Sequence, residues 1–157
     1  MTKGTCLCKA IEISTDIEPK ATVACSCTSC QACSASAFTI NLVYPKGTIE
    51  VTKGKEHLKV FKGMQEDLLR SLHHHLKVET DMWGGIVEKA DSGNDVFRHF
   101  CDTCGNAIYT QTVDGTFFVK GPVLKGLYNN PIMHVFTRNL PTWAEGVTTG
   151  DRKKDGA

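Results

Sequence analysis

The distribution of cysteine constrains this chain more than any other feature of its sequence. Eight cysteines occur among 157 residues, in three groups with short internal spacing. Disulfides, a redox pair, a structural metal knot and a catalytic metal site all use closely spaced cysteines. Other features of the sequence are therefore needed to choose among these four interpretations. The groups are Cys6 and Cys8; Cys25, Cys27, Cys30 and Cys33; and Cys101 and Cys104.

The overall composition favours metal binding over disulfides. The first residues, MTKGTCLCKAIEI, lack the apolar stretch of a signal peptide. No apolar run approaches the ~18 residues that a membrane helix needs. We therefore expect a soluble cytoplasmic protein, in which a reducing environment disfavours disulfides. Eighteen basic and 17 acidic residues nearly cancel, so charge predicts neither a nucleic-acid nor a membrane partner.

Short segments rich in β-branched and aromatic residues alternate with turn residues along the chain. Hydrophobic residues make up 41% and charged residues 22%, which is typical of a globular domain. We predict a mainly β, antiparallel fold in one domain over residues 1–147, followed by a flexible tail over 148–157. The expected strands are 8–13, 21–25, 37–44, 48–52, 57–61, 96–100, 107–113, 116–121 and 133–137.

One segment breaks the strand pattern. In QEDLLRSLHHHL, residues 65–76, leucines recur at steps of three and four, which predicts one short amphipathic helix. Its histidines 73–75 would point in directions about 100° apart, so they indicate a solvated surface and not one metal site. Gly-rich residues 81–95 predict a loop, in which Trp83 either covers a pocket or anchors the loop in a core.

The outer cysteine groups together can supply a closed metal site. Cys101-x2-Cys104 can grip one zinc ion, and Gly105 permits the positive φ that such a turn requires. If Cys6 and Cys8 lie two residues apart on a strand, both sulfurs face the same way and complete four ligands. A site with four thiolates is structural, because it leaves no position for a substrate. The alternative is four reduced thiols packed in a core.

The middle group predicts a different site. Cys25, Cys27 and Cys30 supply three thiolates, the number of protein ligands typical of a catalytic zinc with an open position. Three thiolates on Zn²⁺ leave a net charge of −1, which suits thiol chemistry better than activation of water. Cys33 is a candidate fourth ligand, and closure of the site by Cys33 would favour a non-catalytic zinc-binding interaction or chaperone-like module. A redox pair of Cys27 and Cys30 is the third hypothesis.

Four motifs occur in an order that resembles one known family. CLC, CSCTSCQACSASAF, RHFCDTCGNAIY and PIMHVFTRNLPTW, from Gly4 to Trp143, are similar to the glutathione-dependent formaldehyde-activating enzymes, a family that includes centromere-protein-V-like proteins. The resemblance implies a zinc-binding antiparallel β-tent with two Zn²⁺ per chain. It implies a structural zinc on Cys6, Cys8, Cys101 and Cys104, and a catalytic zinc on Cys25, Cys27 and Cys30.

The resemblance also implies a reaction. The family joins formaldehyde to the thiol of glutathione to give S-(hydroxymethyl)glutathione, and it is classed as a carbon–sulfur lyase because the reverse step cleaves that bond. We therefore expect a lyase that uses glutathione or another small thiol as co-substrate. Ser26 stands where the family usually has His, and residues 64–95 are an insertion relative to a compact member. A related carbon–sulfur reaction on another thiol adduct fits equally well.

Four further side chains are candidates for supporting roles. Arg98 and Arg138 either receive a substrate carboxylate or are ordinary surface arginines. Ser34 and Ser36 either donate hydrogen bonds to metal-bound sulfur or cap a turn.

Overall fold

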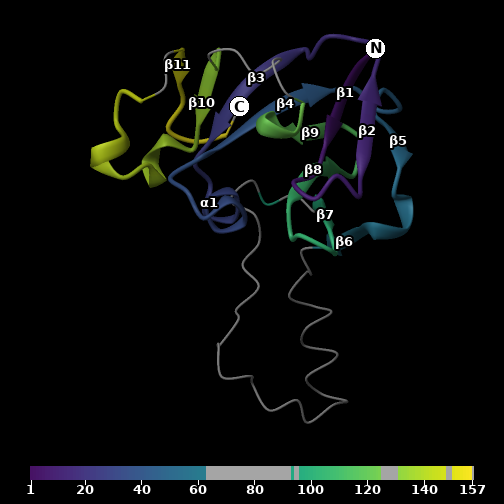
Figure 1. The fold of residues 1–157 in the computed structure, drawn as a ribbon. Helices are drawn as coiled ribbons and strands as arrows, with labels where there is room; N and C mark the ends of the chain where they lie inside the picture. Colours follow the sequence, from purple (N-terminus) through teal and green to yellow (C-terminus); the bar gives the residue numbers. More distant parts are fainter. Residues whose placement is uncertain (63–92, 94–95, 125–130, 148–149, 157) are drawn as a thin grey trace, which may run out of the picture.

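A computed structural model describes residues 1–62, 93, 96–124, 131–147 and 150–156 of the chain. Strands dominate these residues, and the α-helix among them is short (Figure 1). Four 3₁₀ turns lie at Lys55–His57, Gly121–Val123, Thr137–Asn139 and Thr142–Ala144. The strands and the helix are β1 (Thr2–Thr5), β2 (Glu12–Thr15), β3 (Ala21–Cys25), α1 (Thr28–Ser34), β4 (Thr39–Tyr44), β5 (Glu50–Lys53), β6 (Leu58–Lys62), β7 (Val96–Cys101), β8 (Ala107–Thr112), β9 (Phe117–Lys120), β10 (Met133–Val135) and β11 (Asp151–Arg152).

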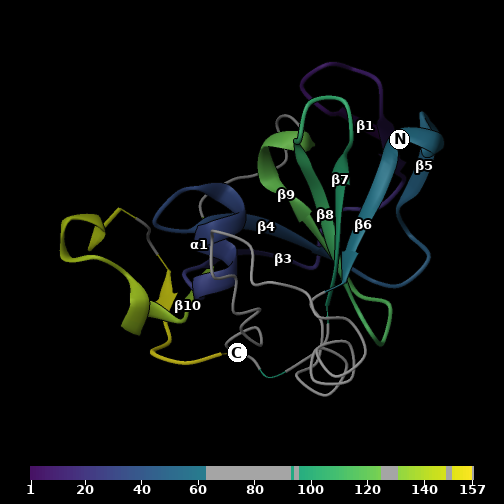
Figure 2. The ribbon, with the colours of Figure 1, turned by 90° about the horizontal axis from the view of Figure 1, so that it is seen from below.

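The strands form two sheets, as the prediction of a mainly β fold requires. A small antiparallel sheet has the order β1-β2-β5, and a larger one has the order β11-β10-β3-β4-β9-β8-β7-β6. From β3 to β6 every neighbouring pair of the larger sheet is antiparallel. Strand β10 departs from the expected antiparallel pattern, because it runs parallel to both β3 and β11. Helix α1 lies beside β3 and β4 in both views (Figures 1 and 2).

The main hydrophobic core joins the two sheets. Ile13 of β2, Leu42 of β4, Ile108 of β8 and Val119 of β9 are completely buried in it. The same cluster contains Cys6 and Cys101, whereas Cys25 and Cys27 pack with Val135 and Phe136 in a separate, smaller cluster. The two metal-binding candidates therefore belong to different parts of the core.

Every predicted strand has a counterpart, although several bounds differ. A tight turn at Asp114-Gly115, a pair that favours hairpin turns, joins β8 to β9: Gly115 has φ +92° and donates its N–H to the Thr112 carbonyl at 2.9 Å. Strand β2 begins at Glu12, later than expected, because the residues before it form a turn around the first cysteines. Strands β1 and β11 and helix α1 were not predicted.

Residues 150–156 of the predicted tail make backbone contacts with β10 and the residues that follow it. Strand β11 pairs with β10, and the Lys153 N–H donates to the His134 carbonyl at 2.8 Å. The Phe136 N–H donates to the Asp155 carbonyl at 3.0 Å. These contacts give hydrogen-bond partners to backbone groups on the outer side of β10.

Some predictions concern residues that the structure leaves undescribed. Apart from residue 93, these lie outside the described residues: the amphipathic helix of 65–76 with its three histidines, the loop of 81–95 with Trp83, and the insertion of 64–95. Among the helices that the structure does describe, none is long and apolar enough to cross a membrane.

Candidate metal centres

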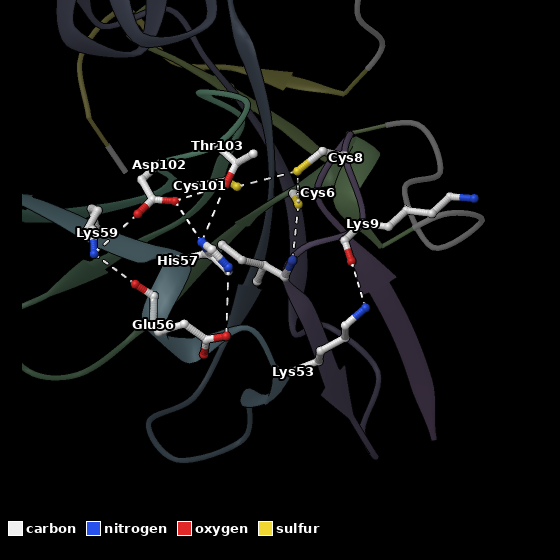
Figure 3. A network of polar contacts seen from close by, with 11 residues as sticks. Cys6, Cys8, Lys9, Lys53, Glu56, His57, Lys59, Cys101, Asp102 and Thr103 are labelled. Carbon is white, nitrogen blue, oxygen red and sulfur yellow. Dashed lines mark hydrogen bonds and ion pairs between the residues drawn. The ribbon is translucent and has the colours of Figure 1, made fainter.

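The outer cysteine groups meet at one point although they lie more than 90 residues apart in sequence. The sulfurs of Cys6, Cys8, Cys101 and Cys104 all lie within 4.8 Å of one another. The Cys6 and Cys8 sulfurs are 3.5 Å apart, and those of Cys8 and Cys101 are 3.8 Å apart (Figure 3). A tetrahedral ion with Zn–S bonds of about 2.3 Å holds its sulfurs about 3.8 Å apart. A disulfide needs about 2.05 Å, so the spacing fits a shared ion.

The local structure that presents Cys6 and Cys8 differs from the prediction. These residues do not lie on a strand but in a turn after β1, in which the Lys9 N–H donates to the Cys6 carbonyl at 3.0 Å. Lys9 adopts a left-handed φ of +62°. Residues two apart on a strand are separated by about 6.6 Å, so a turn is the better way to bring both sulfurs around one point.

The second half of the site is the turn after β7. The Gly105 N–H donates to the Cys101 carbonyl at 2.9 Å, and Gly105 has a φ of +69°. A residue with a side chain rarely adopts such a φ. The expected role of this glycine is therefore confirmed.

Backbone N–H groups point at the sulfurs of this group. The Ile11 N–H lies 3.3 Å from the Cys6 sulfur. Burial opposes ionisation of Cys6, but this bond and contacts with Cys8 and Cys101 lower its pKa. The N–H groups of Cys8 and Asn106 lower the pKa of Cys104 to about 6. Thiolates are the form that binds a metal, so the donor set fits a thiophilic dication such as Zn²⁺.

A polar network holds the Cys101–Cys104 turn against the start of β6. Asp102 accepts from His57 Nδ1 at 3.1 Å and pairs with Lys59 at 3.3 Å (Figure 3). Its N–H donates to the His57 carbonyl at 3.0 Å. Partial burial alone would raise the pKa of Asp102, but His57, Thr103 and Lys59 lower it. The carboxylate therefore stays ionised and fixes the turn that carries two of the four sulfurs.

The structure also brings together Cys25, Cys27 and Cys30, whose sulfurs lie within 4.8 Å of one another. Cys25 ends β3, Cys27 is the N-cap of α1, and Cys30 lies in the first turn of that helix. The Cys27 sulfur accepts the Cys30 N–H at 3.3 Å. A sulfur thus takes the place of the oxygen that usually caps a helix, and one strand end and one helix start gather three sulfurs.

The three thiols have very different pKa values. Hydrogen bonds from Cys25 and Cys30 lower the pKa of Cys27 to about 3, although burial opposes this, and the charge of Arg98 lowers it further. Hydrogen bonding to Cys27 and Cys30 raises the pKa of Cys25. For Cys30, the bond to Cys25 and the charge of Lys120 favour ionisation, but the bond to Cys27 and burial raise the pKa to about 11. Only the Cys27 thiol is therefore ionised at neutral pH in the absence of a metal, and a dication bound by the three sulfurs would have to displace the protons of the other two.

Cys33 is not part of either group. It is exposed on α1, and its sulfur is not among those that converge with Cys25, Cys27 and Cys30. It lines two hollows beside the helix instead. Within the described part of the chain, no fourth Cys, His, Asp or Glu joins the middle group.

The candidate supporting residues divide between the site and other roles. Arg98 lines the first of the two hollows. Arg138 pairs with Asp155 and lies 5.6 Å from the ring centre of Phe136, so it fixes the C-terminal segment. Ser34 donates to the Cys30 carbonyl at 2.8 Å, which is a bond to the helix backbone and not to sulfur. Ser36 is exposed.

One pair near the middle group was missed from the sequence. The fully buried Ser26 Oγ lies 2.8 Å from Nε2 of His134 on β10 and donates to the Ala37 carbonyl at 3.1 Å. Burial and the charge of Arg152 lower the pKa of His134, so its ring is neutral. The His134 imidazole, which comes from β10, therefore lies against Ser26, the position at which the chain lacks a histidine of its own. Because 108 residues separate the pair, no local pattern could have revealed it.

Comparison with known proteins agrees with the resemblance of the motifs. A crystal structure of a Rhodobacter sphaeroides protein shares the fold, with a TM-score of 0.53 and 20% sequence identity over 80% of this chain and 90% of that one. No curated protein matches the sequence. Residues 1–72, which include the first two cysteine groups, match the model of the glutathione-dependent formaldehyde-activating enzyme family. Over these residues, which are fewer than half of the 157, the chain is similar to that family.

Proposed function

We propose that this protein is a zinc-dependent carbon–sulfur lyase that forms or cleaves a thiol adduct of a small aldehyde. The observation that carries the proposal is the convergence of Cys25, Cys27 and Cys30 with no fourth protein ligand among the described residues. The family match supports glutathione as the thiol and formaldehyde as the aldehyde. A related reaction on another thiol adduct uses the same site.

The two cysteine groups have separate roles in this proposal. Cys6, Cys8, Cys101 and Cys104 would hold a structural Zn²⁺, because four thiolates fill its coordination sphere. Cys25, Cys27 and Cys30 would hold the catalytic Zn²⁺, which when bound supplies stabilisation of a substrate thiolate at neutral pH.

The reaction needs no oxidant or reductant. In the forward direction the thiol sulfur adds to the carbonyl carbon, so a C–S bond forms and the C=O π bond breaks. The proton of the thiol ends on the former carbonyl oxygen, which becomes a hydroxyl. In reverse, the C–S bond breaks, the C=O π bond forms again, and the hydroxyl proton returns to the thiol. The protein has to favour the thiolate and hold it in place, and both tasks would suit a Zn²⁺ ion held by Cys25, Cys27 and Cys30.

Several residues of the chain would support the site without contacting the substrate. The Cys30 N–H bonded to the Cys27 sulfur fixes the start of α1. Ser26 anchors the turn between Cys25 and Cys27, through His134 and through its own N–H, which donates to the Val135 carbonyl at 3.1 Å. The Gln31 side chain donates hydrogen bonds to the carbonyls of Ala37 and Asn139 at 3.0 and 2.9 Å, which attach α1 to the segments that carry these two residues.

The test is a rate measurement with the zinc-loaded protein. Magnetisation exchange in NMR with ¹³C-formaldehyde and glutathione reports how fast S-(hydroxymethyl)glutathione forms and breaks. We expect exchange to accelerate in proportion to the concentration of the loaded protein and to return to the background rate after chelation of the metal. A fully loaded protein that leaves the exchange at background, with glutathione and with other small thiols, would contradict the proposal and favour a zinc-binding interaction module.

A further inference from the structure

Two hollows flank helix α1 and share a wall. The first, of about 450 Å³, lies against β7, β8 and β9, and the second, of about 600 Å³, extends toward the turn that carries Cys6. Both volumes are in the range of small-molecule sites. Four residues line both hollows: Cys33, Gly105, Ala107 and Lys120.

The lining of the hollows is cationic. Arg98 and Lys120 line the first, Lys9 and Lys120 line the second, and no Asp or Glu among the described residues lines either. Lys9 is exposed to water, whereas Lys120 is only 8% exposed. An anion that enters either hollow therefore meets the ammonium group of Lys120, which is poorly hydrated because it is buried.

Lys120 is buried and has no carboxylate partner in the part of the chain that the structure describes. Its Nζ donates to the Oδ1 atom of Asn41 at 2.9 Å, and Asn41 is the residue directly opposite it on β4. Across the described residues, no carboxylate lies within ion-pair distance of Lys120 or of Arg98. A buried cation with only a neutral amide as partner is costly unless negative charge comes from elsewhere.

The neighbouring cysteine group supplies only part of that negative charge. Arg98 and Lys120 lie close enough to Cys27 and Cys30, respectively, for their charges to act on these thiols. Three thiolates with one dication carry a net charge of −1, but the two side chains carry +2. One positive charge therefore remains for a ligand that enters the hollow.

We propose that Lys120, oriented by Asn41, and Arg98 bind a carboxylate of the thiol substrate and so select an acidic thiol over a neutral one. This inference rests on the proposed function, because it assumes that the thiol end meets the cysteine group. Phe100 and Tyr109 in the same lining, with Tyr109 stacked on His99 at 4.3 Å, give the substrate an apolar wall. The strands that carry Lys120 and Arg98 hold both cations in fixed positions.

The test measures binding without chemistry. S-methylglutathione keeps both carboxylates but has no thiol, and its diethyl ester removes their charges. We expect zinc-loaded wild type to bind the acid more tightly than the ester in calorimetric titrations. Lys120→Gln should weaken binding of the acid by about 10- to 100-fold, the range for loss of a charge-assisted hydrogen bond. It should leave binding of the ester nearly unchanged.

Two further variants keep the test decisive. Lys20→Gln removes a charge from an exposed lysine outside both hollows and should bind both probes as wild type does. Arg98→Gln changes a partly exposed side chain and should also reduce the preference for the acid, even if Lys120→Gln does not fold. Equal binding of acid and ester by wild type would overturn the inference. A Lys120→Gln protein that loses zinc but still binds the acid more tightly than the ester would also overturn it. In that case Lys120 would stabilise the metal-binding cysteines and would not bind the substrate carboxylate.

The outcomes separate this inference from the proposed function. Turnover of a thiol adduct without any preference for the acid would contradict the carboxylate site and leave the lyase proposal standing. A clear preference for the acid in a protein that accelerates no exchange would support the carboxylate site and contradict the lyase.

Discussion

Cys104→Ser is expected to unfold the domain or to destabilise it severely. Structural zinc contributes on the order of 10 kcal/mol in small zinc modules, which is comparable to the whole stability of a typical domain. The ion would tie the turn after β1 to the turn after β7, and Cys6 and Cys101 of the same group lie in the main core. Thermal unfolding followed by circular dichroism, together with zinc content, measures the effect.

Cys33→Ser is the matched control for this prediction. It makes the same chemical change at a cysteine that is exposed and outside both groups. We expect the control to melt at the temperature of wild type. A Cys104→Ser protein that melts with the control and retains two zinc ions would show that the four-cysteine site is not structural.

Cys27→Ser is expected to abolish activity while sparing the fold. Substitution of a residue that only hydrogen-bonds to a metal ligand typically reduces metal affinity or activity by 10- to 100-fold. Loss of a ligand itself should therefore reduce the exchange rate by more than about 100-fold. The domain should survive because Cys27 packs in the smaller cluster with Val135 and Phe136 and not in the main core. Serine is also a good N-cap, so the start of α1 is preserved.

The comparison of melting curves tests the division into two roles. We expect Cys27→Ser to melt near wild type, to hold one zinc ion instead of two, and to show only background exchange. If Cys27→Ser and Cys104→Ser unfold alike, the assignment of one structural and one catalytic site is wrong.

The sequence revealed the grouping of the cysteines because their spacing is short. It also indicated that Gly105 has positive φ, and the structure confirms this. The turn at Cys6–Lys9 could not be predicted in the same way, because Lys9 adopts a left-handed φ without the glycine that usually signals it. The backbone N–H of Ile11 donates to the Cys6 sulfur. Such a donor cannot be predicted from the sequence, because almost every residue type has a backbone N–H.

The unpredicted elements share a physical cause. Helix α1 has seven residues and none of them is buried, so it shows no apolar periodicity; the Cys27 cap and the bonds of Gln31 hold it instead. Strands β1 and β11 are short edge strands, stabilised by backbone pairing with their neighbours. Lys120 resembles any strand lysine in the sequence, and only the fold shows that it is buried and close enough to Cys30 for its charge to act on that thiol.

The zinc content of the purified protein tests the central claim most directly. Elemental analysis under reducing conditions should find two Zn²⁺ per chain in wild type, and still two in Cys33→Ser, because Cys33 lies outside both converging groups. Loss of one ion in Cys33→Ser would make Cys33 a ligand and close the site proposed for catalysis. A wild-type protein without zinc, in which native disulfides join these cysteines, would contradict the account as a whole.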